Sequence, residues 1–535
     1  DVTASPNPIT LTNTQIDVKS DNVILMDLRN AGTLQTSGLA TTLGGYLSGA
    51  SLTSTSNNYK FKYAVVDGTT LNINSNINKA DTTTTSDDYV FTRRLLLQNS
   101  LLNVNAGNTV TANLNTTELT SIDSNLTVPV GLSISASSKS SGNTTTGVNV
   151  ANGATISVDR TDSGNGGVGA YVNYGKVHNE GKIEVEKTTP NDHAVGIYAT
   201  NGTEVNNDTT GTVEVGGKDS IGILGLSYRI DSKGNVVYEK FGTTGTTKPA
   251  LISDKIGLVD VKNSGKITLD GDNSLGIYAK NNSLDATGTN ADYLRDSITY
   301  TNAANDGEIT MTGKNAIGMI IEGGIATNDT KGKITISGQE GVAMYGTAIT
   351  GAGMAGHTPG KIHSELNNKG TIDLADTTTS TPIIGMFTND ADTDIYTSGT
   401  INVGKKSYGV YGASNNVSMT GGAINVGDDG VGIFATGSSD SEAASVHSDV
   451  NLAGGTINVG NNQAVGVFIA DDATNPLKTT VKNTGTNMTV GTNAFGYVVD
   501  SKTGTELNLG ANSSGATNTL TASIWTDSVY AYTND

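Results

Sequence analysis

The side chains with the widest chemical range in this chain are its five histidines, because imidazole acts as a metal ligand or as a general base. They are His178, His193, His357, His363 and His447. No pair has the i, i+4 spacing of a helical zinc-protease motif. Two histidines on one loop, His357 and His363, indicate adventitious metal binding at most. The sequence therefore predicts no resident metal and no cofactor.

Motifs of other enzyme classes are missing as well. The chain has no Gly-x-Ser-x-Gly elbow, no Gly-Asp-Ser-Gly protease segment and no phosphate-binding glycine loop. Acidic turns at 270–273 and 428–430 raise the question of calcium, but neither follows the twelve-residue loop or the nonapeptide repeat that binds calcium. We expect solvated turns there and no enzymatic activity.

A third group of side chains points to binding. Residues 228–241 alternate around a Ser-Lys-Gly-Asn turn, which predicts a β-hairpin. Aromatic and basic residues on a projecting hairpin are typical of contact hot spots. A neighbouring segment adds more of the same types, so two loops could form one composite surface. The candidate binding residues are Tyr228, Arg229, Lys233, Tyr238, Lys240, Phe241, Tyr293, Arg295 and Tyr300. The alternative is a hairpin that merely folds over the edge of the scaffold.

The scaffold that positions these residues is a sequence repeat running from about residue 156 to residue 499. Each repeat has two aliphatic residues one position apart, then a gap, then a glycine followed by an apolar residue and usually Tyr or Phe. Clear examples are Ile267 and Leu269 with 275–278, and Ile424 and Val426 with 431–434. Such self-similarity marks stacked supersecondary units, because one unit cannot bury its own apolar face.

The alternation within each repeat predicts β-strands. Ile267 and Leu269 should point inward while Lys266 and Thr268 face water, a period of two that a helix does not produce. Asn-x-Gly precedes many of these strands, as at Asn263 to Gly265, and predicts a corner because Asn and Gly readily take left-handed backbone angles. Strand, corner, strand, corner describes one coil. Since parallel crossovers are almost always right-handed, we expect an all-β, right-handed parallel β-helix.

The second strand of each repeat, such as 275–279, should bury Leu275, Ile277 and Ala279 and expose Gly276 and Tyr278. Stacking then predicts an external aromatic ladder beside a glycine ladder. We expect the rings to cover bare glycine backbone, although a continuous ladder is also a possible sugar-stacking platform. Its rungs are Tyr171, Tyr198, Tyr278, Tyr345, Phe387, Tyr411, Phe434 and Phe468.

The domain organisation follows from the repeat. Residues 1–145 form an irregular N-terminal solenoid or cap region, within which a separate head is an alternative. Residues 146–535 form the regular β-helix. Four insertions enter at the same point of the repeat, which places them on one flank, where repeat proteins commonly bind. They span residues 225–264, 280–306, 346–369 and 435–454.

Composition limits the partners. The net charge of −19 makes nucleic acid and anionic lipid poor partners and basic surfaces better ones. Cysteine is absent, so neither disulfides nor thiol chemistry is available. No signal peptide opens the chain and no apolar run is long enough to span a membrane. We interpret the chain as a mature fragment of a longer protein.

The repeat resembles the passenger domains of large type V autotransporter adhesins. The units at Asn179 to Val185 with Val195 to Ala199, and the Gly-Thr-Ile-Asn-Val units at Gly399 and Gly455, are most similar to the fusobacterial outer-membrane adhesins of the RadD kind. The resemblance implies a passenger exposed on the bacterial cell surface, displayed by a C-terminal translocator barrel beyond this sequence. It also implies attachment to host glycans, host immune receptors or partner bacteria. No ligand site is carried over from the family.

Three functions remain open from the sequence. The expected one is a non-enzymatic surface adhesin whose insertions bind the partner. A passive stalk that presents an adhesive tip elsewhere is the second. The third is a β-helical polysaccharide lyase or hydrolase. The catalytic clefts of these enzymes cluster several Asp residues with Lys or Arg, whereas the carboxylates of this chain are scattered through turns.

Overall fold

The computed structural model describes most of the repeat region and parts of the N-terminal region. The described residues are 14–20, 23–29, 32–35, 50–52, 62–74, 76–77, 95–117, 128–135, 146–188, 190–227, 229–230, 236–237, 239–240, 259–281, 284–285, 301–350, 361–390, 392–413, 416–436, 449–470, 479–500, 506–510, 522–524 and 529–534. The fold is all-β, with 61% strand and 1% helix. Among the described residues, no helix is long and apolar enough to cross a membrane.

Each coil contributes three strands. In one coil these are β13 (Val168–Asn173), β14 (Lys176–Asn179) and β15 (Lys182–Val185). Each pairs in parallel with its counterpart one coil later, namely β16 (Val195–Thr200), β17 (Glu204–Asn207) and β18 (Thr212–Val215). This is a parallel β-helix, as predicted. We call the three classes of strand the first, second and third strands.

The expectation of two strands per coil is wrong, because the second strands were missed. Many second strands direct one aliphatic residue inward, such as Val177, followed by a buried asparagine at the corner, such as Asn179. These strands lack the aliphatic pair that marks a third strand, whereas second strands nearer the N-terminus have such a pair, as at Leu71 and Ile73.

The chain divides into two compact units. Unit 1 comprises Asp1–Gly225, Ile230–Val236 and Gly265–Thr268, and unit 2 comprises Leu226–Arg229, Val237–Ser264 and Leu269–Asp535. First strands in unit 1 are β2 (Ile24–Arg29), β5 (Lys62–Asp67), β7 (Leu95–Gln98), β10 (Val130–Ser135), β13, β16 and most of β19 (Ile221–Ser227). Second strands are β3 (Thr33–Gln35), β6 (Thr70–Ile73), β8 (Leu101–Val104), β11 (Gly147–Val150), β14 and β17, and third strands are β9 (Thr109–Thr111), β12 (Thr155–Val158), β15, β18 and most of β24 (Lys266–Leu269). A further pair, β1 (Thr14–Ile16) and β4 (Ala50–Leu52), forms its own small sheet.

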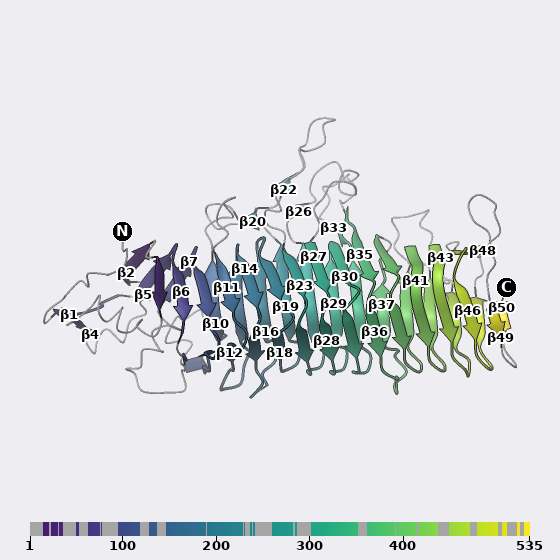
Figure 1. The fold of residues 1–535 in the computed structure, drawn as a ribbon, viewed down its shortest axis with the longest axis horizontal. Coiled ribbons are helices and arrows are strands. Elements are labelled where there is room, and N and C mark those ends of the chain that lie inside the picture. Colours follow the sequence, from purple (N-terminus) through teal and green to yellow (C-terminus); the bar gives the residue numbers. More distant parts are fainter. Residues whose placement is uncertain are drawn as a thin grey trace. The chain divides into compact units, whose positions relative to one another are not determined.

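Unit 2 repeats the same plan (Figure 1). Its first strands are β25 (Leu275–Asn281), β29 (Ile317–Glu322), β32 (Val342–Thr347), β37 (Ile384–Thr388), β40 (Tyr408–Ala413), β42 (Val431–Thr436), β44 (Val465–Ala470), β47 (Phe495–Asp500) and β50 (Val529–Asn534). Its second strands are β23 (Asp260–Asn263), β27 (Thr301–Asn305), β30 (Gly324–Asn328), β35 (Ser364–Asn368), β38 (Thr393–Thr397), β45 (Thr480–Asn483) and β48 (Glu506–Leu509). Its third strands are β28 (Glu308–Met311), β31 (Lys333–Ile336), β36 (Thr371–Leu374), β39 (Thr400–Val403), β46 (Asn487–Val490) and β49 (Ala522–Ile524). Two long strands, β41 (Asn416–Val426) and β43 (Asp449–Val459), merge the second and third positions.

The predicted inward pairs of the third strands form the core. Both members of the pairs Ile183/Val185, Ile309/Met311 and Ile334/Ile336 are completely buried. Polar neighbours such as Glu184 and Thr335 are half-buried on the outside. The period-two pattern therefore gave the correct face of each third strand.

The first strands depart from the predicted alternation. Leu275 is half-buried while Gly276 and Ile277 are both buried, and the register with the next coil passes from Leu275 to Ile277 without pairing Gly276. A Cβ on Gly276 would lie 2.8 Å from Cγ2 of Ile309, inside the core. The expected external glycine ladder is thus wrong, since the glycine faces the interior, where the coil has no room for a side chain.

The Asn-x-Gly corners lie where predicted, between second and third strands, but for a different reason. Left-handed residues such as Asn273 and Asn315 lie in the turns that precede first strands. The corner asparagines are buried instead, as for Asn263 and Asn305. Gly181 has no positive φ, and a Cβ there would lie 2.5 Å from the carbonyl oxygen of Ala151 in the preceding coil. Close stacking of coils, not backbone handedness, selects this glycine.

Candidate functional site

The four insertions leave the β-helix at the same step of the coil, after a first strand. In unit 2, three of them follow β25, β32 and β42, which lie parallel and in register within one sheet. Their exits therefore line one edge of that sheet. Much of each insertion, including 241–258, 286–300, 351–360 and 437–448, lies outside the described residues.

Most of the predicted binding residues also lie outside the described residues. These are Tyr228, Lys233, Tyr238, Phe241, Tyr293, Arg295 and Tyr300. Arg229 belongs to β20 (Arg229–Ile230) and Lys240 to β22 (Glu239–Lys240). The strand β20 pairs with β21 (Val236–Val237), and the turn predicted between them lies outside the described residues.

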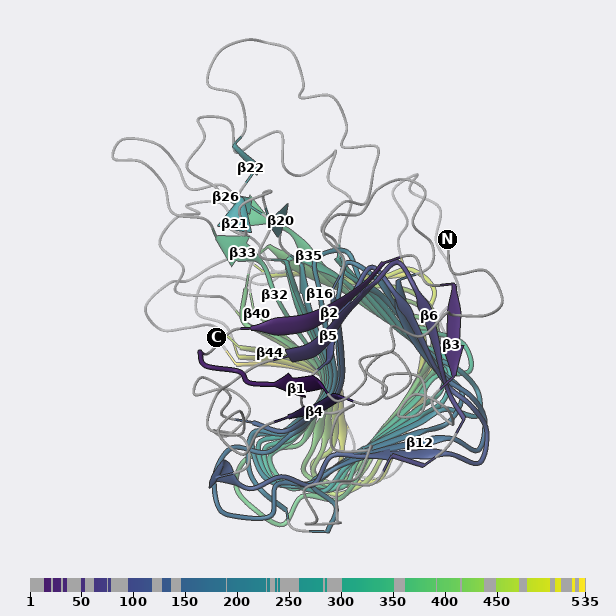
Figure 2. The ribbon, with the colours of Figure 1, turned by 90° about the vertical axis from the view of Figure 1, so that its left-hand side faces the viewer.

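The first two insertions are joined by a strand pair. In unit 2, β22 from the first insertion pairs in parallel with β26 (Leu284–Asp285) from the second, with Lys240 opposite Asp285. Both figures place β22, β26 and β33 (Ile349–Thr350) of the third insertion on the same side of the unit 2 coils (Figures 1 and 2). The two insertions from which the sequence predicted a composite surface are thus in contact at this strand pair.

Buried hydroxyl groups close the bases of these insertions. The Oγ of Ser227, where the first insertion begins, accepts a hydrogen bond of 2.8 Å from the N–H of Val259, where that insertion ends. The same Oγ lies 2.6 Å from Oγ1 of Thr301, where the second insertion rejoins the coil. Ser227 and Thr301 are fully buried. One hydroxyl thus connects the ends of two loops, and a sequence reading has no signal for it.

The third insertion has an equivalent clamp. The Oγ of Ser364 donates to the carbonyl oxygen of Thr347 at 2.8 Å and accepts from the N–H of Gly323 at 2.9 Å. Above it, β33 pairs antiparallel with β34 (Lys361–Ile362). The insertion therefore begins as a hairpin with a fixed base.

A histidine adds an electrostatic anchor beside that clamp. Nε2 of His363 lies 3.3 Å from Oδ2 of Asp394, and both side chains are largely buried. Asn416 and Tyr396 donate to the same carboxylate at 3.0 and 3.2 Å. Burial alone would raise the pKa of Asp394, but the hydrogen bonds and the charge of His363 lower it. His363, which the sequence placed in a loop with His357, is a structural anchor in this arrangement.

An aromatic ladder covers the outer face of the first strands in unit 2. Its ring centroids are 5.4 Å apart for Tyr345 and Phe387, 5.2 Å for Phe387 and Tyr411, 4.8 Å for Tyr411 and Phe434, and 5.3 Å for Phe434 and Phe468. Three of these contacts are stacked and one is edge-to-face, so the rings support one another. They do not lean over glycine, because that glycine faces inward.

The ladder is shorter than the sequence predicted. The register places Ile320 between Tyr278 and Tyr345. Tyr278 instead donates a hydrogen bond of 2.7 Å to Glu322, whose other oxygen lies 2.6 Å from Nζ of Lys280. Burial, followed by the hydrogen bond and the charge of Glu322, raises the pKa of Tyr278. In unit 1, Tyr171 and Tyr198 form a separate pair at 5.3 Å.

The acidic turns cap backbone groups of the next coil. Oδ1 of Asp272 accepts a hydrogen bond of 2.9 Å from the N–H of Lys314, and Oδ1 of Asp428 accepts one of 3.1 Å from the N–H of Asn461. These carboxylates therefore serve the stacking of coils.

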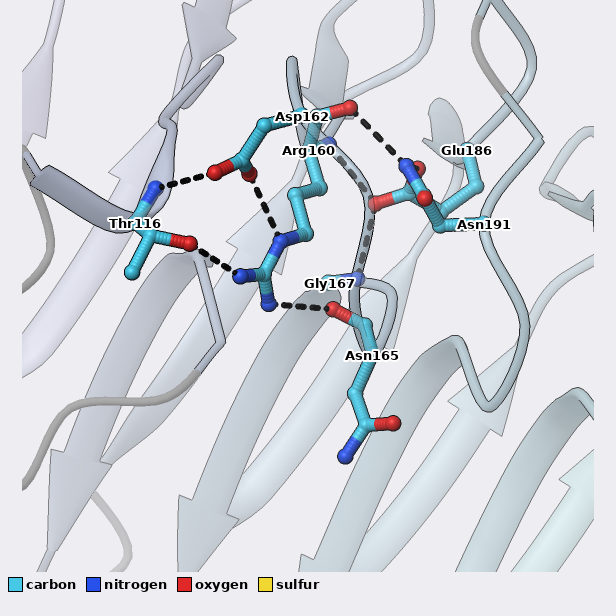
Figure 3. A network of polar contacts seen from close by, with 7 residues as sticks. All are labelled: Thr116, Arg160, Asp162, Asn165, Gly167, Glu186 and Asn191. Carbon is cyan, nitrogen blue, oxygen red and sulfur yellow. Dashed lines mark hydrogen bonds and ion pairs between the residues drawn. The ribbon is translucent and has the colours of Figure 1, made fainter.

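Unit 1 holds a buried polar network that the sequence did not indicate (Figure 3). Glu186, in left-handed conformation at φ 54°, accepts hydrogen bonds at Oε1 from the N–H groups of Arg160 (2.7 Å) and Gly167 (2.8 Å). Its Oε2 accepts from Asn191 at 3.0 Å. Burial raises the pKa of Glu186 in spite of these hydrogen bonds.

Arg160 completes the network. Its guanidinium donates to Asp162 (2.8 Å), to the carbonyl oxygen of Asn165 (3.0 Å) and to Thr116 (2.6 Å). Burial would raise the pKa of Asp162, but hydrogen bonds from Thr116 and Arg160 lower it to about 2. All the partners are backbone or neighbouring side chains, so the network fastens the turn at 159–167 to adjacent coils.

Comparison with known proteins does not assign the chain to a family. The chain matches no protein-family model, no curated protein and no solved structure.

Proposed function

We propose that the chain is the surface-displayed passenger of a bacterial adhesin and that its insertions attach to a host-cell protein or glycan or to another bacterium. The observation that carries the proposal is the strand pair β22–β26, which joins two insertions above a buried clamp. Two joined loops on a fixed base offer a preorganised surface, which lowers the entropy lost on binding. In this proposal, the β-helix serves as the scaffold.

The charge distribution favours a protein or glycan partner over nucleic acid. The chain carries a net charge of −19, while the hairpin segment concentrates Arg229, Lys233 and Lys240 among aromatic residues. A small cationic and aromatic patch on an acidic body is suited to an acidic or sugar-bearing partner with local complementarity. The acidic remainder disfavours polyanions in general.

The test is a deletion of residues 231–239, with a nine-residue deletion of 438–446 in the fourth insertion as the matched control. The full chain and both variants are screened against glycan arrays, host receptor panels and whole bacteria. We expect the first deletion to abolish the strongest binding and the control to keep it, while circular dichroism stays β-rich for both. Equal binding by all three proteins would contradict the role of the hairpin.

If the full chain bound nothing in these panels, the result would favour the alternative of a passive stalk. The lyase alternative has its own assay. Incubation with uronate polysaccharides would yield unsaturated products that absorb ultraviolet light if the chain were a lyase, and we expect none.

A further inference from the structure

An outward amide ladder in unit 1 is interrupted by a histidine. On the outer face of the second strands, Asn103 donates to Asn72 at 2.8 Å and Asn149 donates to Asn103 at 2.9 Å. The register places His178 next in this column, followed by Asn206. Another asparagine would continue the hydrogen-bonded column. The imidazole replaces a side chain that the repeat itself would favour.

Two carboxylates lie beside this histidine. Glu180 and Asp208 each follow a second strand at the same corner of adjacent coils, because β14 and β17 pair in register. Nδ1 of His178 is 2.8 Å from Oδ2 of Asp208, and Nε2 is 3.5 Å from Oε1 of Glu180. One nitrogen and two carboxylate oxygens, one from each residue, all lie within 4.8 Å of one another. Oδ2 of Asp208 is a buried atom, and in spite of its closeness to Nδ1 it accepts no hydrogen bond of favourable geometry from the described residues.

We propose that His178, Glu180 and Asp208 form a binding site for a divalent transition-metal ion such as Zn²⁺. Ligands of a tetrahedral zinc ion lie about 2.0–2.2 Å from the metal and hence roughly 3.3 Å apart. The three ligand atoms, which lie within 4.8 Å of one another, must therefore close by up to about 1.5 Å, a movement that rotation of half-exposed side chains allows. The ion would lie between Nδ1 of His178 and Oδ2 of Asp208, and Glu180 would supply the third ligand.

The donor set determines the class of ion. Imidazole favours zinc, nickel and copper over magnesium and calcium, which prefer oxygen ligands throughout. About half of the His178 side chain is exposed, with 45% of its surface accessible, so water can complete the coordination. A positive ion also relieves the repulsion of two carboxylates that the stacking of coils brings together.

Unit 2 contains a matched position without imidazole. Asp306 and Asp329 follow the paired second strands β27 and β30 at the same corner as Glu180 and Asp208. The residues at the position of His178 are Ala304 and Thr327. This corner has the carboxylate pair but lacks the nitrogen donor, so it serves as an internal control.

The experiment uses the full chain without an affinity tag, freed of metal with EDTA and titrated with ZnCl₂ by calorimetry, with Co²⁺ absorption as a second probe of coordination. We expect one zinc ion per chain. His178→Asn, which restores the amide ladder, and Asp208→Asn should each weaken binding at least tenfold. Asp329→Asn removes the same charge in unit 2 and should leave the affinity unchanged.

Thermal melting distinguishes loss of the site from loss of the fold. Zinc should raise the melting temperature of the wild-type chain but not of His178→Asn, whose own melting temperature without zinc should match the wild type. Absence of zinc binding by the wild type, or unchanged binding by His178→Asn, would overturn the proposal. The latter outcome would assign the ion to another histidine. Neither outcome bears on adhesion, which the insertion deletions test separately.

Discussion

In each unit, the last residues of successive second strands stack into a buried column, which we call the corner column. The two units differ in the residues that fill this column. In unit 2, Asn263 donates to Asn305, Asn305 to Asn328 and Asn328 to Asn368, at 2.7, 2.8 and 2.9 Å. In unit 1, the corresponding positions run Ile73, Val104 and Val150 before two asparagines, Asn179 and Asn207, at 2.7 Å. A residue in a stacked coil has its own counterpart as its neighbour. The column can therefore hold a run of amides, which hydrogen-bond to one another, or a run of apolar side chains, which pack against one another.

An asparagine whose neighbours in the column are apolar needs a hydrogen-bond partner from outside the column. In unit 2 the amide run ends at Thr397, whose hydroxyl accepts a hydrogen bond from Asn368. Buried Met419 and Leu452 follow in the column, and Asn483 comes next, directly after Leu452. Asn483 donates 2.8 Å to the hydroxyl of Tyr497, a tyrosine that replaces an interior aliphatic residue of a first strand. The hydrogen bond to Tyr497 thus replaces the amide neighbours that Asn483 lacks in its column. His178 breaks the outer amide column and lies instead beside two carboxylates, those of Asp208 and Glu180, which are the groups that the proposed ion would use.

The largest effect should come from the middle of the unit 2 run. Asn305→Ala removes the acceptor of Asn263 and the donor to Asn328 and to the carbonyl oxygen of Gly307. Because buried polar groups left without partners cost about 1–3 kcal/mol each, we expect a loss of about 4 kcal/mol in the free energy of unfolding, measured by urea denaturation. The two-member run of unit 1 supplies the control. Asn179→Ala leaves fewer partners stranded and should cost clearly less; equal losses would contradict the column argument.

The polar network of unit 1 should give the next largest effect. Glu186→Ala leaves the buried N–H groups of Arg160 and Gly167 without acceptors, for an expected loss of about 3 kcal/mol in urea denaturation. Glu186→Gln keeps the acceptor for both N–H groups and changes the contact with Asn191 alone. It should therefore recover most of that stability. A variant pair with equal losses would mean that charge, not hydrogen bonding, holds the turn.

The first-strand glycines should behave alike in both units. A Cβ on Gly169 would lie 2.5 Å from the carbonyl oxygen of Gly196, and a Cβ on Gly432 would lie 2.5 Å from that of Gly466. Since overpacking typically costs about 1–3 kcal/mol, each change to alanine should cost about 2 kcal/mol. Hydrogen exchange, which resolves the two units, is the measurement. A difference between the units would show that the repeat constraint is not shared.

The sequence predicted the features that every repeat shares, including part of the aromatic ladder, but missed the contacts that particular coils make with their neighbours. Ile267, Leu269 and their equivalents were assigned correctly because period-two burial acts within one strand. The inward turn of Gly276 and the buried amide run of Asn263 depend on the coil above, so local propensity gave the wrong orientation or reason. Contacts such as Ser227 with Thr301 or Arg160 with Glu186 join residues one coil apart, with long insertions of variable length between some of them. The insertions were located because they interrupt a regular spacing.

The smallest effect is a pH response of opposite sign in the two units. The pKa of Asp394 in unit 2 is lowered, so its contribution to stability is present above the ordinary value of 3.8 and is lost as the pH falls through the lowered pKa. The pKa of Glu186 in unit 1 is raised, so its contribution is present below the ordinary value of 4.5 and is lost as the pH rises through the raised pKa.

Hydrogen exchange followed from about pH 2 to pH 7 measures both responses in one chain. Each unit of pKa shift corresponds to about 1.4 kcal/mol. Protection near Asp394 should increase with pH below the ordinary value of 3.8 and then level off, whereas protection near Gly167 should decrease over the range in which Glu186 ionises, after correction for the intrinsic exchange rate. Asp394→Asn and Glu186→Gln should each flatten the response of their own unit. A response of the same sign in both units would contradict the prediction that hydrogen bonding outweighs burial at Asp394 and that burial outweighs hydrogen bonding at Glu186. The contrast follows from the partners: the interaction with His363 and the hydrogen bonds from Asn416 and Tyr396 outweigh burial at Asp394, whereas burial outweighs the hydrogen bonds at Glu186.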